Sequence, residues 1–96
     1  MSMKMQKFEN VFDALYDGEE AVEMKRRADL AAVLERFIEH RKLTQPQAAK
    51  LLGVSQPRVN DLLRGRLHRF SVDALLTMMD RVEIQIEFKV KFPKAA

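Results

Sequence analysis

The 96-residue sequence has no cysteine, only three glycines and three prolines, and only two histidines. Without cysteine there is no disulfide framework and no thiolate metal site. His40 and His68 lie far apart in the sequence and show no metal-binding pattern. No apolar run approaches the roughly 20 residues that span a bilayer, and no signal peptide is visible. We therefore expect one cytoplasmic domain that has no metal, no cofactor and no membrane partner.

The residue sets that build enzyme sites are also missing from the sequence. There is no glycine-rich phosphate loop, and no nucleophile stands in a pattern with a base. The hydroxyl side chains of Thr44, Ser55 and Ser71 each precede a helical pattern, which is the position of a helix N-cap. These features argue against an enzyme.

Charge is distributed unevenly along the chain, whose formal net charge is +3. Residues 1–43 carry eight Lys/Arg and nine Asp/Glu, a net charge of −1, whereas residues 44–96 carry nine and five, a net charge of +4. The basic excess in the second half favours a polyanionic partner.

Apolar spacing divides the chain into three parts. Residues 1–18 form an arm or a short helix, because Phe8 to Leu15 has helix-like spacing before Gly18 interrupts it. Residues 19–82 form a helical bundle, which begins with a long helix from about Glu19 to Lys42. One face of that helix carries Leu30, Leu34, Phe37, Ile38 and Arg41. Residues 83–96 form a strand and its tail.

The stretch LTQPQAAKLLGVSQPRVNDLLRG, Leu43 to Gly65, predicts two short helices joined by a turn. Thr44 and Ser55 are suitable N-caps, and each is followed by a proline in the first turn, where a missing N–H costs nothing. Gly53 ends the first helix, at Leu52, and Gly65 ends the second. The side chains expected to pack inward are Ala49, Leu52, Val54, Val59 and Leu62. This pattern is typical of a helix-turn-helix, and a further helix, about Val72 to Asp80, follows it.

A helix-turn-helix places the first turn of its second helix against base edges in the major groove. Gln56 lies there and can bond an adenine in bidentate fashion, whereas Gln45, at the head of the first helix, suits a backbone phosphate. The base-contacting candidates are Ser55, Gln56, Pro57, Asn60 and Asp61. Asp61 either accepts from a cytosine amino group or forms a salt bridge with Arg58 or Arg64. The loop RGRLHR should bring Arg64, Arg66, His68 and Arg69 to phosphates or a groove edge.

The segment IQIEFKVKF, Ile84 to Phe92, alternates strictly between apolar and polar residues and predicts a strand with one apolar face. Because the sequence predicts no second strand, we expect this strand to pair with the same strand of a second copy or with a partner's sheet. The alternative is a strand packed back on its own helices. The expected dimerisation residues are Ile84, Ile86, Phe88 and Val90.

Residues 9–92 resemble the XRE family of lambda-repressor-like DNA-binding domains. The likeness rests on NVFDAL near the beginning, the LTQ opening, the SQPRV start of the second helix and the strand tail. Within that family, SQPRVNDLLRGRLHRFSVDALL resembles the HigA-type antitoxin regulators. The resemblance implies a mostly α fold, a five-helix bundle that forms a dimer. The C-terminal strand expected from the alternation would pair across that dimer.

The resemblance also implies a function and a set of contacts. We expect a dimeric repressor on a palindromic double-stranded operator and a RelE-like ribonuclease toxin as a further partner. Gln45 matches a backbone contact of the family, and Arg58 matches a phosphate neighbour. Pro57 and Asp61 depart from the family pattern, which affects the base preference rather than the docking. A regulator without a toxin, or a protein-binding module built on the same bundle, remains the alternative.

Overall fold

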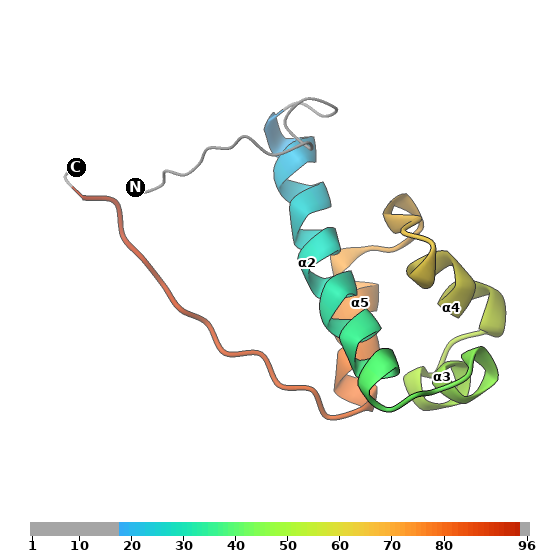
Figure 1. Cartoon of the computed structure of the whole chain (residues 1–96). Helices are drawn as coiled ribbons and strands as arrows, with labels where there is room; N and C mark the ends of the chain where they lie inside the picture. Colours follow the sequence, from blue (N-terminus) through green and yellow to red (C-terminus); the bar gives the residue numbers. More distant parts are fainter. Residues whose placement is uncertain (1–17, 95–96) are drawn as a thin grey trace.

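The computed structural model describes residues 18–94, which form a bundle of four α-helices and one 3₁₀ turn (Figure 1). The elements, in chain order, are α2 (Gly18–His40), α3 (Gln45–Leu52), α4 (Gln56–Leu63), η2 (Leu67–Arg69) and α5 (Val72–Arg81). Within this range four helices stand where the family resemblance implied five. The short helix expected between Phe8 and Leu15 lies outside the described residues. None of the described helices is both long and apolar enough to cross a bilayer.

Helix α2 is the long element against which the bundle packs, and it runs beside α5 (Figure 1). Its first turn carries Glu19 and Glu20, whose charge suits the positive end of the helix dipole. Leu34 is fully buried and Ile38 is nearly so, as the apolar spacing predicts. The predicted inner face is confirmed except at its last member, Arg41, which is exposed and lies over the ring of Phe37 at 4.9 Å.

Helices α3 and α4 begin at the caps that the sequence predicts. The Thr44 hydroxyl accepts the Gln47 backbone N–H at 3.3 Å, and the Gln47 side chain in return accepts the Thr44 N–H at 2.9 Å. This reciprocal pair is a capping box, which satisfies two N–H groups that the helix itself leaves free. Ser55 caps α4 in the simpler way, because its hydroxyl accepts only the Arg58 N–H, at 3.3 Å.

The turn between α3 and α4 is fixed by Gly53, whose φ of 73° lies in the left-handed region. The Gly53 N–H donates to the carbonyl of Ala49 at 2.9 Å and so closes the last turn of α3. The guanidinium of Arg81, from the end of α5, covers the glycine so closely that an added Cβ would lie 2.6 Å from it. The turn of the helix-turn-helix thus lies directly against the end of α5.

One apolar core joins all four helices. Its largest fully buried side chains are Phe70, Leu34, Leu52, Leu62, Leu75, Met79 and Val59. Four of the five positions expected to pack inward from α3 and α4 are buried, and Val54 is partly buried against the same core. Helix α2 packs against α5, α4 and η2, and α3 packs against α4 and α5. This core holds the heads of α3 and α4 in place.

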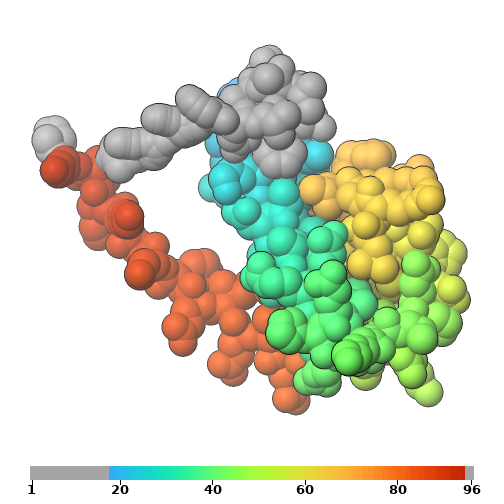
Figure 2. All heavy atoms as spheres, in the orientation of Figure 1, coloured from blue at the N-terminus to red at the C-terminus, as the bar shows by residue number. Residues whose placement is uncertain are grey.

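The tail, residues 84–92, does not form the predicted strand within residues 18–94. It is extended and runs away from the helices (Figures 1 and 2). Ile84 is its anchor, because its N–H donates to the carbonyl of Met79 at 3.0 Å and its side chain packs on the core. Beyond Ile84, no backbone hydrogen bond ties the described tail to the helices. A strand needs a hydrogen-bonded neighbour, and the described part of one chain offers none.

The tail's last apolar residues do not pack on its own helices either. Phe88 is 88 % exposed and Phe92 is 84 % exposed. The apolar side chains of Phe88, Val90 and Phe92 therefore have no apolar partner within the described residues.

Candidate nucleic-acid interface

The heads of α3 and α4 lie side by side on one surface of the molecule. Gln45 from α3 and Gln56, Pro57 and Asn60 from α4 line a single shallow depression. Gln56 and Pro57 are exposed, whereas Gln45 and Asn60 are half-buried. Residues 56 and 60 are four apart and so project from the same face of α4. Two long amides, a shorter amide and a proline ring thus meet at the point where both helices begin.

These four residues form a surface that can make hydrogen bonds without adding charge. Each amide side chain offers both a donor and an acceptor. That combination matches the donor and acceptor pair on the major-groove edge of adenine. Pro46 and Pro57 each remove one N–H from a helix start, so fewer backbone donors remain there beside the side-chain amides.

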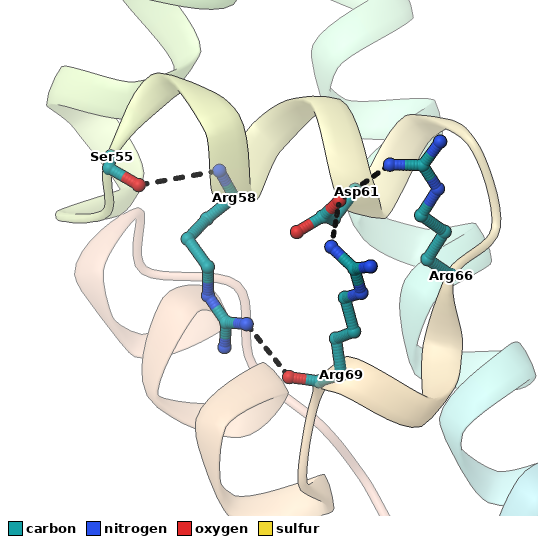
Figure 3. Close-up of polar contacts among 5 residues, drawn as sticks. All are labelled: Ser55, Arg58, Asp61, Arg66 and Arg69. Atoms are coloured by element: carbon teal, nitrogen blue, oxygen red, sulfur yellow. Dashed lines mark hydrogen bonds and ion pairs between the residues drawn. The ribbon is translucent and has the colours of Figure 1, made fainter.

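Asp61 occupies a different environment from Gln56 and Asn60. It is only 8 % exposed, and its Oδ1 accepts hydrogen bonds from Nη1 of Arg66 and from Nη1 of Arg69, both at 3.2 Å (Figure 3). The carboxylate points back toward the loop that follows α4. Of the two roles expected from the sequence, the structure therefore shows a salt bridge, and its partners are Arg66 and Arg69 rather than Arg58 or Arg64.

The backbone after α4 explains these partners. The Gly65 N–H donates to the Leu62 carbonyl, and the Arg66 N–H donates to the Asp61 carbonyl. This pair of bonds, with Gly65 at a φ of 74°, is the Schellman ending of a helix. It reverses the chain at once and returns the loop along the last turn of α4. Arg66 and Arg69 are thereby brought to a carboxylate five and eight residues earlier.

The two arginines also determine the ionisation of Asp61. Removal of the carboxyl from water would raise its pKa, but the hydrogen bonds and charges of Arg66 and Arg69 outweigh that effect and lower the pKa. Asp61 therefore carries its negative charge at neutral pH. Each arginine uses one Nη1 for the pair and keeps the rest of its guanidinium for another acceptor. Their side chains remain 40 % and 51 % exposed.

Arg58 is held by its own chain. Its Nη1 donates to the carbonyl of Arg69 at 2.8 Å, and its guanidinium lies 4.2 Å from the ring centre of Phe70 (Figure 3). A cation over an aromatic face is stabilised by the charge distribution of the ring. Arg58 therefore connects α4 to the end of η2, a role that differs from the expected contact with phosphate.

The remaining expected contacts fall into two groups. Arg64 is exposed and makes no ion pair within residues 18–94. His68 instead lines a separate depression in the first half of α2, whose other lining residues are Glu19, Glu20, Glu23, Met24 and Arg27. Its three glutamates outnumber its one arginine, so this surface does not suit a polyanion. The described part of the chain brings no three His, Asp or Glu side chains into a metal-binding group.

Sequence reasoning missed three participants: Gln47 of the capping box, Phe70 under Arg58, and Arg66 and Arg69 as the partners of Asp61. The Thr-x-x-Gln spacing could have revealed the first. The other two depend on how the loop returns along α4, which no local spacing shows.

Comparison with known proteins agrees with this geometry. A family model described as a helix-turn-helix domain matches residues 14–91. A solved structure named as an XRE-family transcriptional regulator is 30 % identical in sequence, with a TM-score of 0.69 over 75 % of this chain and 81 % of that one. No curated protein matches the chain. The matched residues span the whole described bundle, and the chain belongs to the helix-turn-helix domain family.

Proposed function

We propose that the protein is a transcriptional regulator that binds a specific double-stranded DNA sequence as a dimer and acts as a repressor. The observation that supports this function is the shared surface formed by Gln45, Gln56, Pro57 and Asn60 at the heads of α3 and α4. A helix-turn-helix presents this end of its second helix to the major groove. The similar solved structure is itself named as an XRE-family transcriptional regulator.

Each side chain of this surface has a role in the proposed complex. Gln56 lies in the first turn of α4 and bonds an adenine edge, with Asn60 reading a neighbouring base one turn further on. Ser55 and Pro57 border the same groove. Gln45 binds a phosphate through its side-chain amide, which fixes the orientation of α4.

Phosphate contacts come from the loop after α4. Arg64, Arg66 and Arg69 are at least partly exposed there and keep guanidinium donors free. Three such arginines in each protomer give about six phosphate contacts for a dimer. We leave Asp61 out of the base contacts and Arg58 out of the phosphate contacts, because both side chains are engaged within the protein.

The experiment that tests this function is selection of bound duplexes from a random pool. We expect the parent protein to enrich a palindrome with adenine in each half-site. Gln56→Ala should lose about 1–3 kcal/mol on the selected duplex and little on random DNA, because it removes a base contact. Gln45→Ala is the matched control, since loss of a phosphate contact should weaken both duplexes alike. No enrichment by the parent protein would contradict sequence-specific binding.

Salt dependence provides an independent test. With about six phosphates neutralised, the affinity should fall roughly 10³-fold between 50 and 200 mM salt. Arg66→Ala should weaken specific and random duplexes equally and flatten the salt dependence. An affinity that does not change with salt would favour the protein-binding module instead.

An antitoxin role is the narrower form of this proposal. It rests on the likeness of residues 55–76 to HigA-type antitoxin regulators. If a RelE-like ribonuclease is encoded beside this gene, co-expression should relieve its toxicity, and the purified pair should form a complex. Growth inhibition that persists on co-expression would contradict the antitoxin role and favour a regulator that acts without a toxin.

A further inference from the structure

The tail offers an edge for pairing on both sides of an extended backbone. Residues 84–92 are extended, and the described part of the chain supplies no strand beside them. Along one face the apolar side chains after Ile84 are exposed, Ile86 to 42 %, Phe88 to 88 %, Val90 to 69 % and Phe92 to 84 %. An alternating segment of this kind is suited to pair with another strand that presents the same pattern.

We propose that residues 84–92 pair with the same segment of a second copy, antiparallel and centred on Phe88. This inference rests on the dimer in the proposed function and specifies its contact. In this register Ile84 lies opposite Phe92 of the second copy, Ile86 lies opposite Val90, and Phe88 lies opposite its own counterpart. All nine residues of the alternating segment take part, and every apolar side chain meets an apolar one.

Charge on the opposite face selects this register. With Phe88 at the centre, Glu87 of each copy lies opposite Lys89 of the other, and Gln85 lies opposite Lys91. Opposite charges across a strand pair stabilise it, whereas like charges destabilise it. The dimer therefore contains two Glu87–Lys89 pairs and no pair of like charges.

The neighbouring registers are each less favourable. Centring the pair on Glu87 or on Lys89 places that residue opposite its own counterpart and shortens the overlap. Centring the pair between two residues, instead of on one residue, puts apolar side chains opposite polar ones. A parallel pair in register would set Lys89 beside Lys89, Lys91 beside Lys91 and Glu87 beside Glu87. Only the register centred on Phe88 satisfies the apolar alternation and the charges together.

The bundle provides a place for the second copy's last aromatic ring. Ile84 packs against the core, and its backbone is tied to the end of α5. Directly opposite residues in an antiparallel pair have Cβ atoms about 5 Å apart. Phe92 of the second copy therefore reaches the edge of the core where Ile84 lies, and its exposed ring gains a contact there. The apolar face of the two-stranded ribbon continues the core of each bundle.

The register also sets how far apart the two DNA-binding surfaces lie. Moving the centre of the pair by one residue changes the separation of the two bundles by two residue steps, about 7 Å along the strand axis. A defined register thus gives a defined spacing of half-sites, because the anchor at Ile84 couples the tail to the helices.

Charge exchange in the full-length protein tests the proposal, with the dimer dissociation constant measured by sedimentation at low salt. Glu87→Lys and Lys89→Glu should each weaken self-association roughly tenfold or more, because each creates two like-charge pairs. The double variant should restore the parent dissociation constant. A mixture of the two single variants should form heterodimers in preference to either homodimer.

Lys91→Glu is the matched control, because it makes the same charge change as Lys89→Glu but faces the neutral Gln85. Its effect on self-association should be small. An equal effect of both substitutions, or no recovery in the double variant, would overturn the register. A parent protein that sediments as a monomer throughout, or variants that all remain dimers, would overturn pairing through the tail. Enrichment of single half-sites by such a protein would still support the proposed DNA binding, so the two proposals fail separately.

Discussion

Gly53 is the position at which a single methyl group should reveal how the helix-turn-helix is held. Its φ of 73° lies in the left-handed region, and the guanidinium of Arg81 lies over the place where a Cβ would stand. Gly53→Ala therefore meets two obstacles. The backbone must keep a conformation that L-residues avoid, and the Arg81 side chain must move from a position 2.6 Å from the new carbon.

The two obstacles differ in size. A left-handed conformation costs an L-residue roughly 1–2 kcal/mol. The arginine contact adds less, because the atoms involved lie at the flexible end of a long side chain. The free energy of unfolding should therefore fall by about 1–2 kcal/mol. For a domain of this length, each kcal/mol lowers the midpoint of thermal unfolding by roughly 4–8 °C.

Gly65→Ala is the matched control for this experiment. Gly65 has almost the same φ, 74°, but an added Cβ would have no atom within 4 Å. Urea unfolding of both variants should show a loss at each position and a larger loss at Gly53. In an Arg81→Ala background the difference between the two positions should disappear. If Gly53→Ala were as stable as the parent protein, the argument that this turn requires glycine would be refuted.

Three further predictions concern stability. Asp61 has a lowered pKa in the folded protein. Its ionised carboxylate therefore adds to the free energy of unfolding above its ordinary pKa of 3.8, and this contribution is lost as the pH falls through the pKa of the folded protein. Asp61→Asn should thus lose less stability on acidification than the parent protein, as measured by urea unfolding at a series of pH values. If the free energy of unfolding of both proteins fell equally at low pH, this prediction would be contradicted. Leu34→Ala should cost about 2–5 kcal/mol because the side chain is fully buried, whereas Leu51→Ala, at a position 43 % exposed, should cost much less. Thr44→Ala should cost about 0.5–2 kcal/mol in thermal unfolding because the capping box with Gln47 is lost, and an unchanged midpoint would show that the cap is dispensable.

The elements of the fold that depend on near neighbours could be predicted from the sequence. Thr44, Ser55 and Gly53 act within four residues of themselves, so helix starts and the turn follow from local chemistry. The apolar spacing of α2 likewise identified Leu34 and Ile38 as core residues. Because both helix heads are set by these local signals, the meeting of Gln45 and Gln56 on one surface was also predictable.

The environment of the charged residues depends on the path of the loop after α4. The Schellman ending at Gly65 returns the chain along the helix, and only then do Arg66 and Arg69 reach the carboxylate of Asp61. The same return places Phe70 under Arg58. Residue spacing carries no information about such contacts, because they require the three-dimensional course of the loop.

For the tail, the sequence predicts the character of each face but not the conformation. Alternation from Ile84 to Phe92 specifies which face is apolar and which carries charge, because successive side chains of an extended chain point to opposite sides. Whether that segment becomes a strand depends on backbone hydrogen bonds from a neighbour, and residues 18–94 provide none. Local chemistry therefore fixes the helices, their caps and the character of each face, whereas the ion pairs of Asp61 and the conformation of the tail follow from contacts between segments that only folding or association brings together.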